Sequence, residues 1–170
     1  MEECRTLAEK AFSDGSALSR LAAMVKAQGG DCTYIENPSK FPEAPFKREV
    51  KAEKSAYMAR MDTEMCGIAS SLLGAGRITK ESSIDYSAGI ELKKKTGQKV
   101  EKGEILAVLY ASREELFEAA EAEFLKAVAF SESLPQKEPL IYGCVTKDGA
   151  ERLMQPVGQN AAYRKEEENS

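Results

Sequence analysis

The stretch SSLLGAGRITKESSIDYSAGIELKKKTGQKVEKGEILAVLY, residues 70–110, decides the fold of this chain. It contains a Gly-Ala-Gly-Arg segment, an Ile-Asp pair and two glycine-containing turns ahead of an apolar run. That run, Ile105–Tyr110, predicts a strand, and short strands are also predicted around Ile84–Tyr86 and Ile90–Leu92. The stretch therefore indicates a β unit with closely spaced turns.

Two tight turns are predicted inside this stretch, at Thr96–Gly97 and at Lys102–Gly103. The glycines expected to supply positive φ or close backbone approach are Gly89, Gly97 and Gly103. The basic segment Lys93–Lys99, KKKTGQK, spans the first turn. It has no interleaved aromatic residues on which bases could stack, so we interpret it as a solvated hairpin tip.

After the stretch, the motif SREE predicts a helix that starts with a capping box between Ser112 and Glu115. We expect this helix to end at Pro135, with an apolar stripe of Leu116, Phe117, Ala120, Phe124 and Val128. The segment EPLIYGCV, residues 138–145, is a candidate for a final edge strand. From Lys147 onward the periodicity is lost, and we expect YRKEEENS, residues 163–170, to be a disordered tail.

Before the stretch, REVKAEKSAYMARM predicts short β runs that are broken near Ser55–Ala56. Asp62 is expected to cap a helix that ends at Gly74. The apolar face of this helix comprises Met65, Ile68, Ala69 and Leu72. Three prolines in NPSKFPEAPF, residues 37–46, remove backbone donors and favour extended geometry, which predicts a linker and a domain boundary.

Two further helices are predicted ahead of this linker. The first covers residues 1–12, and the second, SALSRLAAMVKAQGGD, has Ser16 as its cap and ends at Gly29–Gly30. The second helix is expected to pack against a sheet through Leu18, Leu21, Ala22 and Val25.

The composition is that of an ordinary globular protein: 170 residues, 42% hydrophobic and 31% charged, with a net charge of −4. No basic field points to nucleic acid as a partner. No apolar run approaches the roughly 20 residues that cross a bilayer. The N-terminus, MEECRTLAEK, lacks the apolar core of a secretory signal. We therefore expect a cytoplasmic location, with neither membrane nor nucleic acid as a partner.

The side chains available for catalysis are limited, because the chain contains no histidine. This excludes histidine-based nucleophile pairs, metal sites and acid–base catalysis. The four cysteines are Cys4, Cys32, Cys66 and Cys144. No two of them have the sequence spacing of ligands in a metal knuckle, and we expect them to be reduced. We interpret Cys66, in the first turn of a helix, as a packing thiol, and Asp85 as a turn or capping carboxylate.

Several motifs in this order resemble the C-terminal part of pyrimidine-nucleoside phosphorylases and the related thymidine phosphorylases. They are MVKAQGGD, the proline-rich linker, VKAEKSAYMARMD, GIASSLLGAGR and SIDYSAGIELKKKTGQKVEKGEILAVLY. Each motif is weak alone, and their combination is specific. The resemblance covers the chain from about residue 1 to residue 130.

The resemblance implies a glycosyltransferase reaction of pyrimidine metabolism and nucleoside salvage. Inorganic phosphate, the co-substrate of the full enzyme, attacks C1′ of a pyrimidine nucleoside and gives a free base and a sugar 1-phosphate. In the family, phosphate and base are bound by an N-terminal helical domain and the first part of an α/β domain. The chain is therefore expected to be a C-terminal fragment or one half of a split protein.

On this interpretation the chain alone is inactive. It has no catalytic, substrate-binding or metal-binding residues and no cofactor of its own. Its expected partner is the missing N-terminal phosphorylase segment, on the same or a separate chain, and the full enzyme is a possible homodimer.

The fold class implied by the resemblance is α+β. Residues 1–36 would be the helical end of the phosphorylase α/β domain, and residues 37–46 the linker. Residues 47–132 would be the C-terminal-like domain, an α/β-hammerhead related to a barrel-sandwich hybrid, with its following helix. Residues 133–170 would be an edge segment and a disordered tail.

The segment Gly74, Ala75, Gly76 and Arg77 follows a helix C-terminus, whereas a phosphate cradle would favour a helix N-terminus. The residues alone predict a C-cap and a loop. The resemblance implies further that this loop faces the cleft between domains, where Arg77 would reach a carbonyl or carboxylate and hold the closed form. Ala56 departs from the family, which has glycine there. If that position needs positive φ, alanine costs about 1 kcal/mol.

Two alternatives stay open. One is a non-catalytic interaction module that has the same fold. The other is a biotinyl- or lipoyl-like carrier domain, because TGQKVEKGEILAVL resembles the turn-and-strand run of such carriers. A carrier would continue into a tight hairpin that presents one lysine, whereas a capped helix is predicted after Tyr110.

Overall fold

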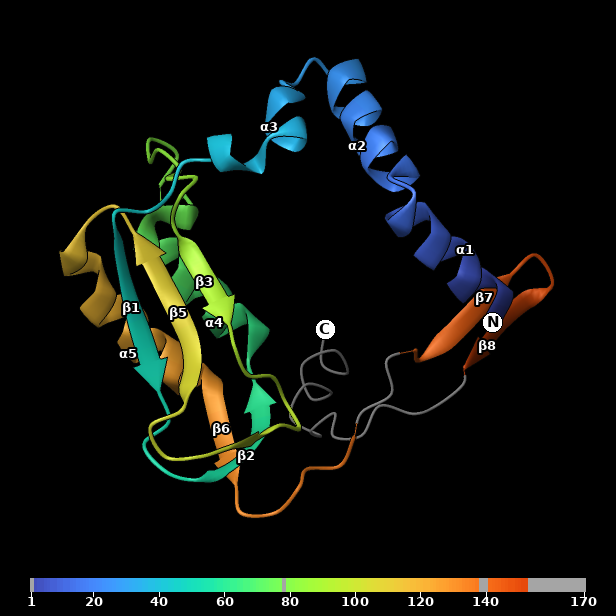
Figure 1. Cartoon of the computed structure of the whole chain (residues 1–170). Coiled ribbons are helices and arrows are strands. Elements are labelled where there is room, and N and C mark those ends of the chain that lie inside the picture. Colours follow the sequence, from blue (N-terminus) through green and yellow to red (C-terminus); the bar gives the residue numbers. More distant parts are fainter. Residues whose placement is uncertain (1, 78, 138–140, 153–170) are drawn as a thin grey trace, which may run out of the picture.

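The structure, a computed structural model, describes residues 2–77, 79–137 and 141–152. The fold is α+β, as predicted (Figure 1). The helices are α1 (Glu2–Ser13), α2 (Ser16–Ala27), α3 (Thr33–Glu36), α4 (Thr63–Ser70) and α5 (Phe117–Ala127), with 3-10 turns at Pro38–Lys40 and Glu114–Leu116 and a π turn at Ser71–Ala75. The strands are β1 (Phe46–Lys51), β2 (Ala56–Met61), β3 (Gly89–Leu92), β4 (Lys99–Val100), β5 (Ile105–Ala111), β6 (Val128–Ser131), β7 (Gly143–Thr146) and β8 (Gly149–Arg152). Across these described ranges, every helix is too short or too polar to traverse a lipid bilayer.

Helices α1 and α2 lie apart from the sheets formed by β1–β6 (Figure 1), and none of their residues is buried. On α2, Leu18 is 56% exposed and Leu21 is 41% exposed. The prediction that this face packs against a sheet is therefore wrong for the described part of the chain. The physical reason is that the buried side chains of the sheets pack against α4 and α5 instead.

The predicted end of α2 is confirmed. Gly29 has a φ of 78°, and both Gly29 and Gly30 donate their N–H groups to carbonyls of the last turn. The predicted start is shifted by one residue. Ser16 is the first helical residue rather than the cap, and its N–H donates to Asp14 Oδ1 at 2.9 Å.

Two three-stranded antiparallel sheets form the β unit, in the orders β1-β5-β3 and β4-β2-β6. Strand β5 is central in the first sheet, where Val108 lies opposite Glu49 of β1 and Glu91 of β3. Its residues Leu106–Leu109 are buried consecutively, because a strand covered on both faces does not alternate between apolar and polar residues. The break predicted near Ser55 is confirmed, because it separates β1 from β2. The chain also leaves the strand conformation between β3 and β5, where turns were predicted.

Helices α4 and α5 pack on the sheets and complete one hydrophobic core. The largest fully buried side chains are Phe124, Met58, Leu73, Leu106, Leu109, Val50 and Val100. Asp62 caps α4 as predicted, because its Oδ1 accepts hydrogen bonds from the N–H groups of Glu64 and Met65 at 3.1 Å. The predicted face of α4 is confirmed at Ala69, which is buried, and at Leu72, which packs against the core, but it is wrong at Ile68, which is 46% exposed. Leu73, which was not predicted, continues the buried face.

Helix α5 buries most of its predicted stripe, namely Phe117, Ala120 and Phe124. Its predicted ends are wrong. Ser112 forms no capping box with Glu115, because its hydroxyl donates to a carboxylate from another loop. The helix ends at Ala127 rather than at Pro135, because Val128 begins β6 and pairs with β2.

The strand predicted around Ile84–Tyr86 is absent, because these residues form a loop and a turn. The predicted C-terminal strand corresponds in part to β7, which pairs with β8. Strand β8 lies after Lys147, where the sequence loses its periodicity, and the predicted disordered tail, residues 163–170, lies outside the described residues. Residues 138–140 and 153–170 lie outside the described residues.

Two glycine predictions are confirmed and one is wrong. Gly97 and Gly103 have φ values of 89° and 84°, whereas Gly89 lies in β3 without positive φ. Ala56 is buried in β2, and within the described ranges no residue other than glycine has positive φ. The strain expected for an alanine at this position is therefore absent.

Truncation of the core side chain Phe124 tests this packing. Because Phe124 is fully buried between α5 and the sheets, we expect F124A to lower the free energy of unfolding by about 3–5 kcal/mol. Urea denaturation followed by circular dichroism measures this change. The matched control is L134A, since Leu134 is 66% exposed, and it should change stability by no more than about 0.5 kcal/mol. Equal effects of the two substitutions would contradict the assigned core.

Candidate functional site

The Gly74–Arg77 loop directly follows α4 and the π turn that extends it. Gly74 has a φ of 107°, a conformation that side chains rarely adopt, and it reverses the chain at the helix end. Gly76 lies against Ser71, and a Cβ at this glycine would collide with Ser71 Oγ. The loop is thus folded back onto the end of its own helix, which leaves Arg77 as its exposed terminal side chain. Arg77 makes no hydrogen bond or ion pair with any described residue.

Asp85 holds this loop in place through hydrogen bonds of its backbone and its carboxylate. Its N–H donates to the carbonyl of Gly74 at 2.9 Å. Its Oδ1 accepts from the N–H and hydroxyl of Ser87, at 2.9 and 2.7 Å. Its Oδ2 accepts from the hydroxyl of Ser112, immediately after β5, at 2.6 Å. We call these three residues, Asp85, Ser87 and Ser112, the Asp85 cluster.

The hydrogen bonds of the Asp85 cluster stabilise the charged carboxylate. That from Ser112 is the largest cause, followed by that from Ser87, and together they lower the pKa of Asp85 from 3.8 to about 2. The prediction that Asp85 is a turn or capping carboxylate is confirmed. Sequence reasoning missed its partner Ser112, because that serine is 27 residues away and was assigned to a local capping box.

The other sequence-predicted positions are not part of this site. Cys66 packs against the core, and partial burial, followed by the negative charge of Asp62, raises the pKa of its thiol. This confirms its interpretation as a packing thiol. All four cysteines are free: Cys4, Cys32, Cys66 and Cys144.

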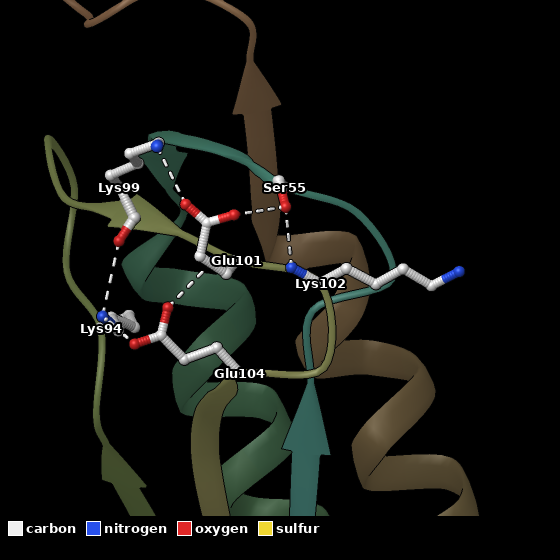
Figure 2. A network of polar contacts seen from close by, with 6 residues as sticks. All are labelled: Ser55, Lys94, Lys99, Glu101, Lys102 and Glu104. Atoms are coloured by element: carbon white, nitrogen blue, oxygen red, sulfur yellow. Dashed lines mark hydrogen bonds and ion pairs between the residues drawn. The ribbon is translucent and has the colours of Figure 1, made fainter.

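The basic segment Lys93–Lys99 links β3 of one sheet to β4 of the other, and three of its lysines, Lys93, Lys94 and Lys99, have acidic partners. Figure 2 shows the contacts of Lys94 and Lys99. Lys94 pairs with Glu104 at 2.5 Å, and Lys99 pairs with Glu101 at 2.9 Å. The other carboxylate oxygen of Glu101 accepts from the hydroxyl of Ser55 at 2.6 Å. The segment is solvated as predicted, because most of its residues are exposed. It is not a hairpin tip, because β3 and β4 pair within different sheets.

A carrier would present its lysine on a tight hairpin after Tyr110, whereas Lys102, which Figure 2 shows, precedes β5. The side chain of Lys102 points away from the network, and only its backbone N–H takes part, as a donor to Ser55 Oγ at 3.0 Å. Strand β5 is followed by α5 rather than by a second hairpin. The geometry of a carrier domain is therefore not reproduced after Tyr110.

Elsewhere, a cavity of about 300 Å³ lies at the other end of β5, lined by Lys51, Glu53, Lys54, Leu106, Leu125, Val128 and Phe130. Within the described ranges, no polar or charged side chain is buried. In the same ranges, no group of three or more His, Cys, Asp or Glu side chains is arranged to hold a metal ion. The Gly74–Arg77 loop with the Asp85 cluster is therefore our candidate functional site.

Substitution of Gly74 tests the loop geometry. A Cβ at Gly74 would lie 3.3 Å from Asp85 Cβ, and φ is 107°. We expect G74A to lower the free energy of unfolding by at least about 1–2 kcal/mol. Gly67 in α4 is the matched control, since no atom lies within 4 Å of a Cβ placed there, and G67A should raise stability by about 0.5–1 kcal/mol. Thermal unfolding of both variants measures the difference, and a stabilising G74A would contradict the described loop.

The Asp85 carboxylate also predicts a dependence of stability on pH. Because the pKa of Asp85 is lower in the folded chain, its contribution is fully present above the unfolded value of 3.8 and is lost as pH falls toward about 2. We expect the free energy of unfolding to fall less steeply over that range in D85N than in the wild type. Urea titrations at several acidic pH values measure this slope. The control is D148N, whose carboxylate accepts no hydrogen bond from a described residue, and a wild-type slope in D85N would refute the assignment.

Comparison with known proteins places these residues in a family. Residues 57–131 match the family model described as the pyrimidine nucleoside phosphorylase C-terminal domain. The chain is 39% identical over 142 residues to the pyrimidine-nucleoside phosphorylase of Geobacillus stearothermophilus, an alignment that covers 84% of this chain and 33% of that protein. It is 43% identical over 116 residues to that of Staphylococcus aureus (strain USA300), which covers 68% of this chain and 27% of that protein.

The chain spans about a third or less of the length of these curated relatives. The matched family model includes the Gly74–Arg77 loop and the whole Asp85 cluster. The chain therefore corresponds to a C-terminal portion of the pyrimidine-nucleoside phosphorylase family.

Proposed function

We propose that this chain serves as the C-terminal, cleft-closing part of a pyrimidine-nucleoside phosphorylase. In the reaction, phosphate attacks C1′ of a pyrimidine nucleoside and releases the free base. The Gly74–Arg77 loop would contact the segment that binds phosphate and base, and would hold the closed form while the reaction proceeds. The curated relatives with this name support the reaction class.

The observation that carries this proposal is the state of Arg77. Its guanidinium is exposed and has no partner among the described residues, whereas the backbone that leads to it is fixed by Gly74 and Asp85. A guanidinium offers five N–H donors in a fixed planar arrangement, which suits a carboxylate or carbonyl on a facing surface. A contact that holds the closed form requires a loop whose backbone is already held in place and an arginine that is available to bind the facing surface.

The groups that bind phosphate and base are assigned to another segment. Such groups work best as preorganised donors in an environment that excludes water. No polar side chain is buried in the described part of this chain, and histidine is absent from the whole sequence. The partner would therefore be the N-terminal phosphorylase segment, on the same or a separate chain, within a cytoplasmic and homodimeric enzyme.

The finer domain organisation belongs to the same proposal. Residues 1–36 would complete the α/β domain of the enzyme, which would cover the exposed apolar side chains of α2. Residues 37–46 would be the linker. Residues 47–132 would form the α/β-hammerhead, related to a barrel-sandwich hybrid, and the two three-stranded sheets with α4 and α5 support this assignment.

A chimeric enzyme tests the proposal. The aligned C-terminal portion of the Geobacillus stearothermophilus relative is replaced by this chain, and release of uracil from uridine and phosphate is measured. We expect turnover by the chimera and none above background by the 170-residue chain alone. In the chimera, R77A should lower kcat/KM by about 10- to 100-fold, because a hydrogen bond to a charged group contributes roughly 1.5–3 kcal/mol.

The matched control is R60A, which removes an exposed arginine paired with Asp62 at the other end of α4. It should leave kcat/KM within about twofold of the unsubstituted chimera. Uracil release by the chain alone would show that the catalytic groups lie in this chain. Equal activity of R77A and the unsubstituted chimera would show that Arg77 makes no closing contact.

A further inference from the structure

We propose that Asp85 is a positioning residue: together with Ser87 and Ser112, it fixes the Gly74–Arg77 loop to the end of β5 and so presets the direction in which Arg77 leaves the domain. The catalytic consequence of this inference rests on the proposed closing role of Arg77. The structural part, that the Asp85 cluster holds the loop, is independent of that role and is tested separately.

The first step is that Asp85 joins three segments that are far apart in the sequence. Its N–H donates to the Gly74 carbonyl at 2.9 Å, and its carboxylate accepts from Ser87 at 2.7 Å and from Ser112 at 2.6 Å. Gly74 lies in the π turn after α4, whereas Ser112 follows β5. Asp85 thus connects the start of the loop, through its backbone N–H, to the end of the central strand of the core sheet, through its carboxylate.

The second step is that the loop has no comparable support of its own. Ser71 is the neighbour against which Gly76 packs, and Arg77 makes no polar contact with described residues. Beyond it, Thr79 and Ser82 close a small local turn, in which the Thr79 N–H donates to Ser82 Oγ at 3.0 Å. Beside the burial of Leu73 in the core, the connection from Gly74 through Asp85 to β5 is therefore the hydrogen-bonded long-range restraint on where Arg77 begins.

The third step is that the cluster can weaken without disruption of the core. Asp85 and Ser87 are half-buried and Ser112 is exposed, and none of the three belongs to the hydrophobic core. Gly74 fits the same arrangement, because a Cβ there would lie 3.3 Å from Asp85 Cβ. Loss of one hydroxyl should therefore release the loop and leave the sheets folded.

The structural test uses the full 170-residue chain and amide hydrogen exchange followed by NMR. In S112A, exchange of the amide at position 85, which donates to the Gly74 carbonyl, should accelerate about tenfold or more. The conservative variant S112T keeps a hydroxyl and should restore the wild-type rate to within about twofold. D85N, as a second variant, should accelerate exchange of the Ser87 amide.

The matched control is D62N, because Asp62 also accepts backbone N–H hydrogen bonds but acts within one helix terminus. It should leave exchange at position 85 unchanged. The Leu109 amide in β5 reports global opening and should exchange equally slowly in all variants that test the cluster. Unchanged exchange at positions 85 and 87 in both S112A and D85N would overturn the inference, as would acceleration at Leu109 by the same factor.

The catalytic test is a double-mutant cycle in the chimeric phosphorylase. S112A should lower kcat/KM by about 3- to 10-fold because the loop must be ordered on closure, and S112T should restore it. If Ser112 acts through Arg77, S112A should have no further effect once R77A is present. Multiplicative effects of S112A and R77A would overturn the positioning role. Faster loop exchange in S112A combined with a silent R77A would instead refute the proposed function while the structural part stands.

Discussion

Burial of strand β5 is the constraint on which the rest of this structure depends. Its residues Leu106–Leu109 are shielded on both faces, and its backbone pairs with β1 on one side and β3 on the other. A strand in this position cannot shift its register without exposing apolar side chains or unpairing backbone groups. The segments that leave its two ends are therefore fixed in space, whatever their own sequences prefer.

Different polar groups occupy the two ends of β5. Before the strand, Glu101 and Glu104 pair with lysines of the Lys93–Lys99 segment and keep two exposed turns in place (Figure 2). After the strand, Ser112 donates to Asp85, which supports the Gly74–Arg77 loop. The first network makes exposed ion pairs, which contribute little to stability. The second joins distant segments beside Arg77, which has no polar partner among the described residues, and it is the one with a proposed role in closure.

Much of this fold could be predicted from local sequence. Asp62 at a helix start and the apolar run Ile105–Tyr110 each specify an element through interactions within a few residues, and both predictions are confirmed. Predictions failed where pairing with a segment far away in the sequence competes with the local pattern. The helix after Ser112 stops at Ala127, well before Pro135, since pairing of the following residues with β2 outweighs their helical pattern.

The candidate site divides in the same way. The sequence by itself determined the glycine-rich helix end, the loop that follows it and the family to which these motifs belong, because these depend on backbone conformation and on residue order. Only the tertiary structure decided that Asp85 meets Ser112, that α2 leaves its apolar face uncovered by the described residues, and that Ser112 is not a helix cap. Each of these depends on which segments the two small sheets bring together, and no periodicity within a single segment records that pairing.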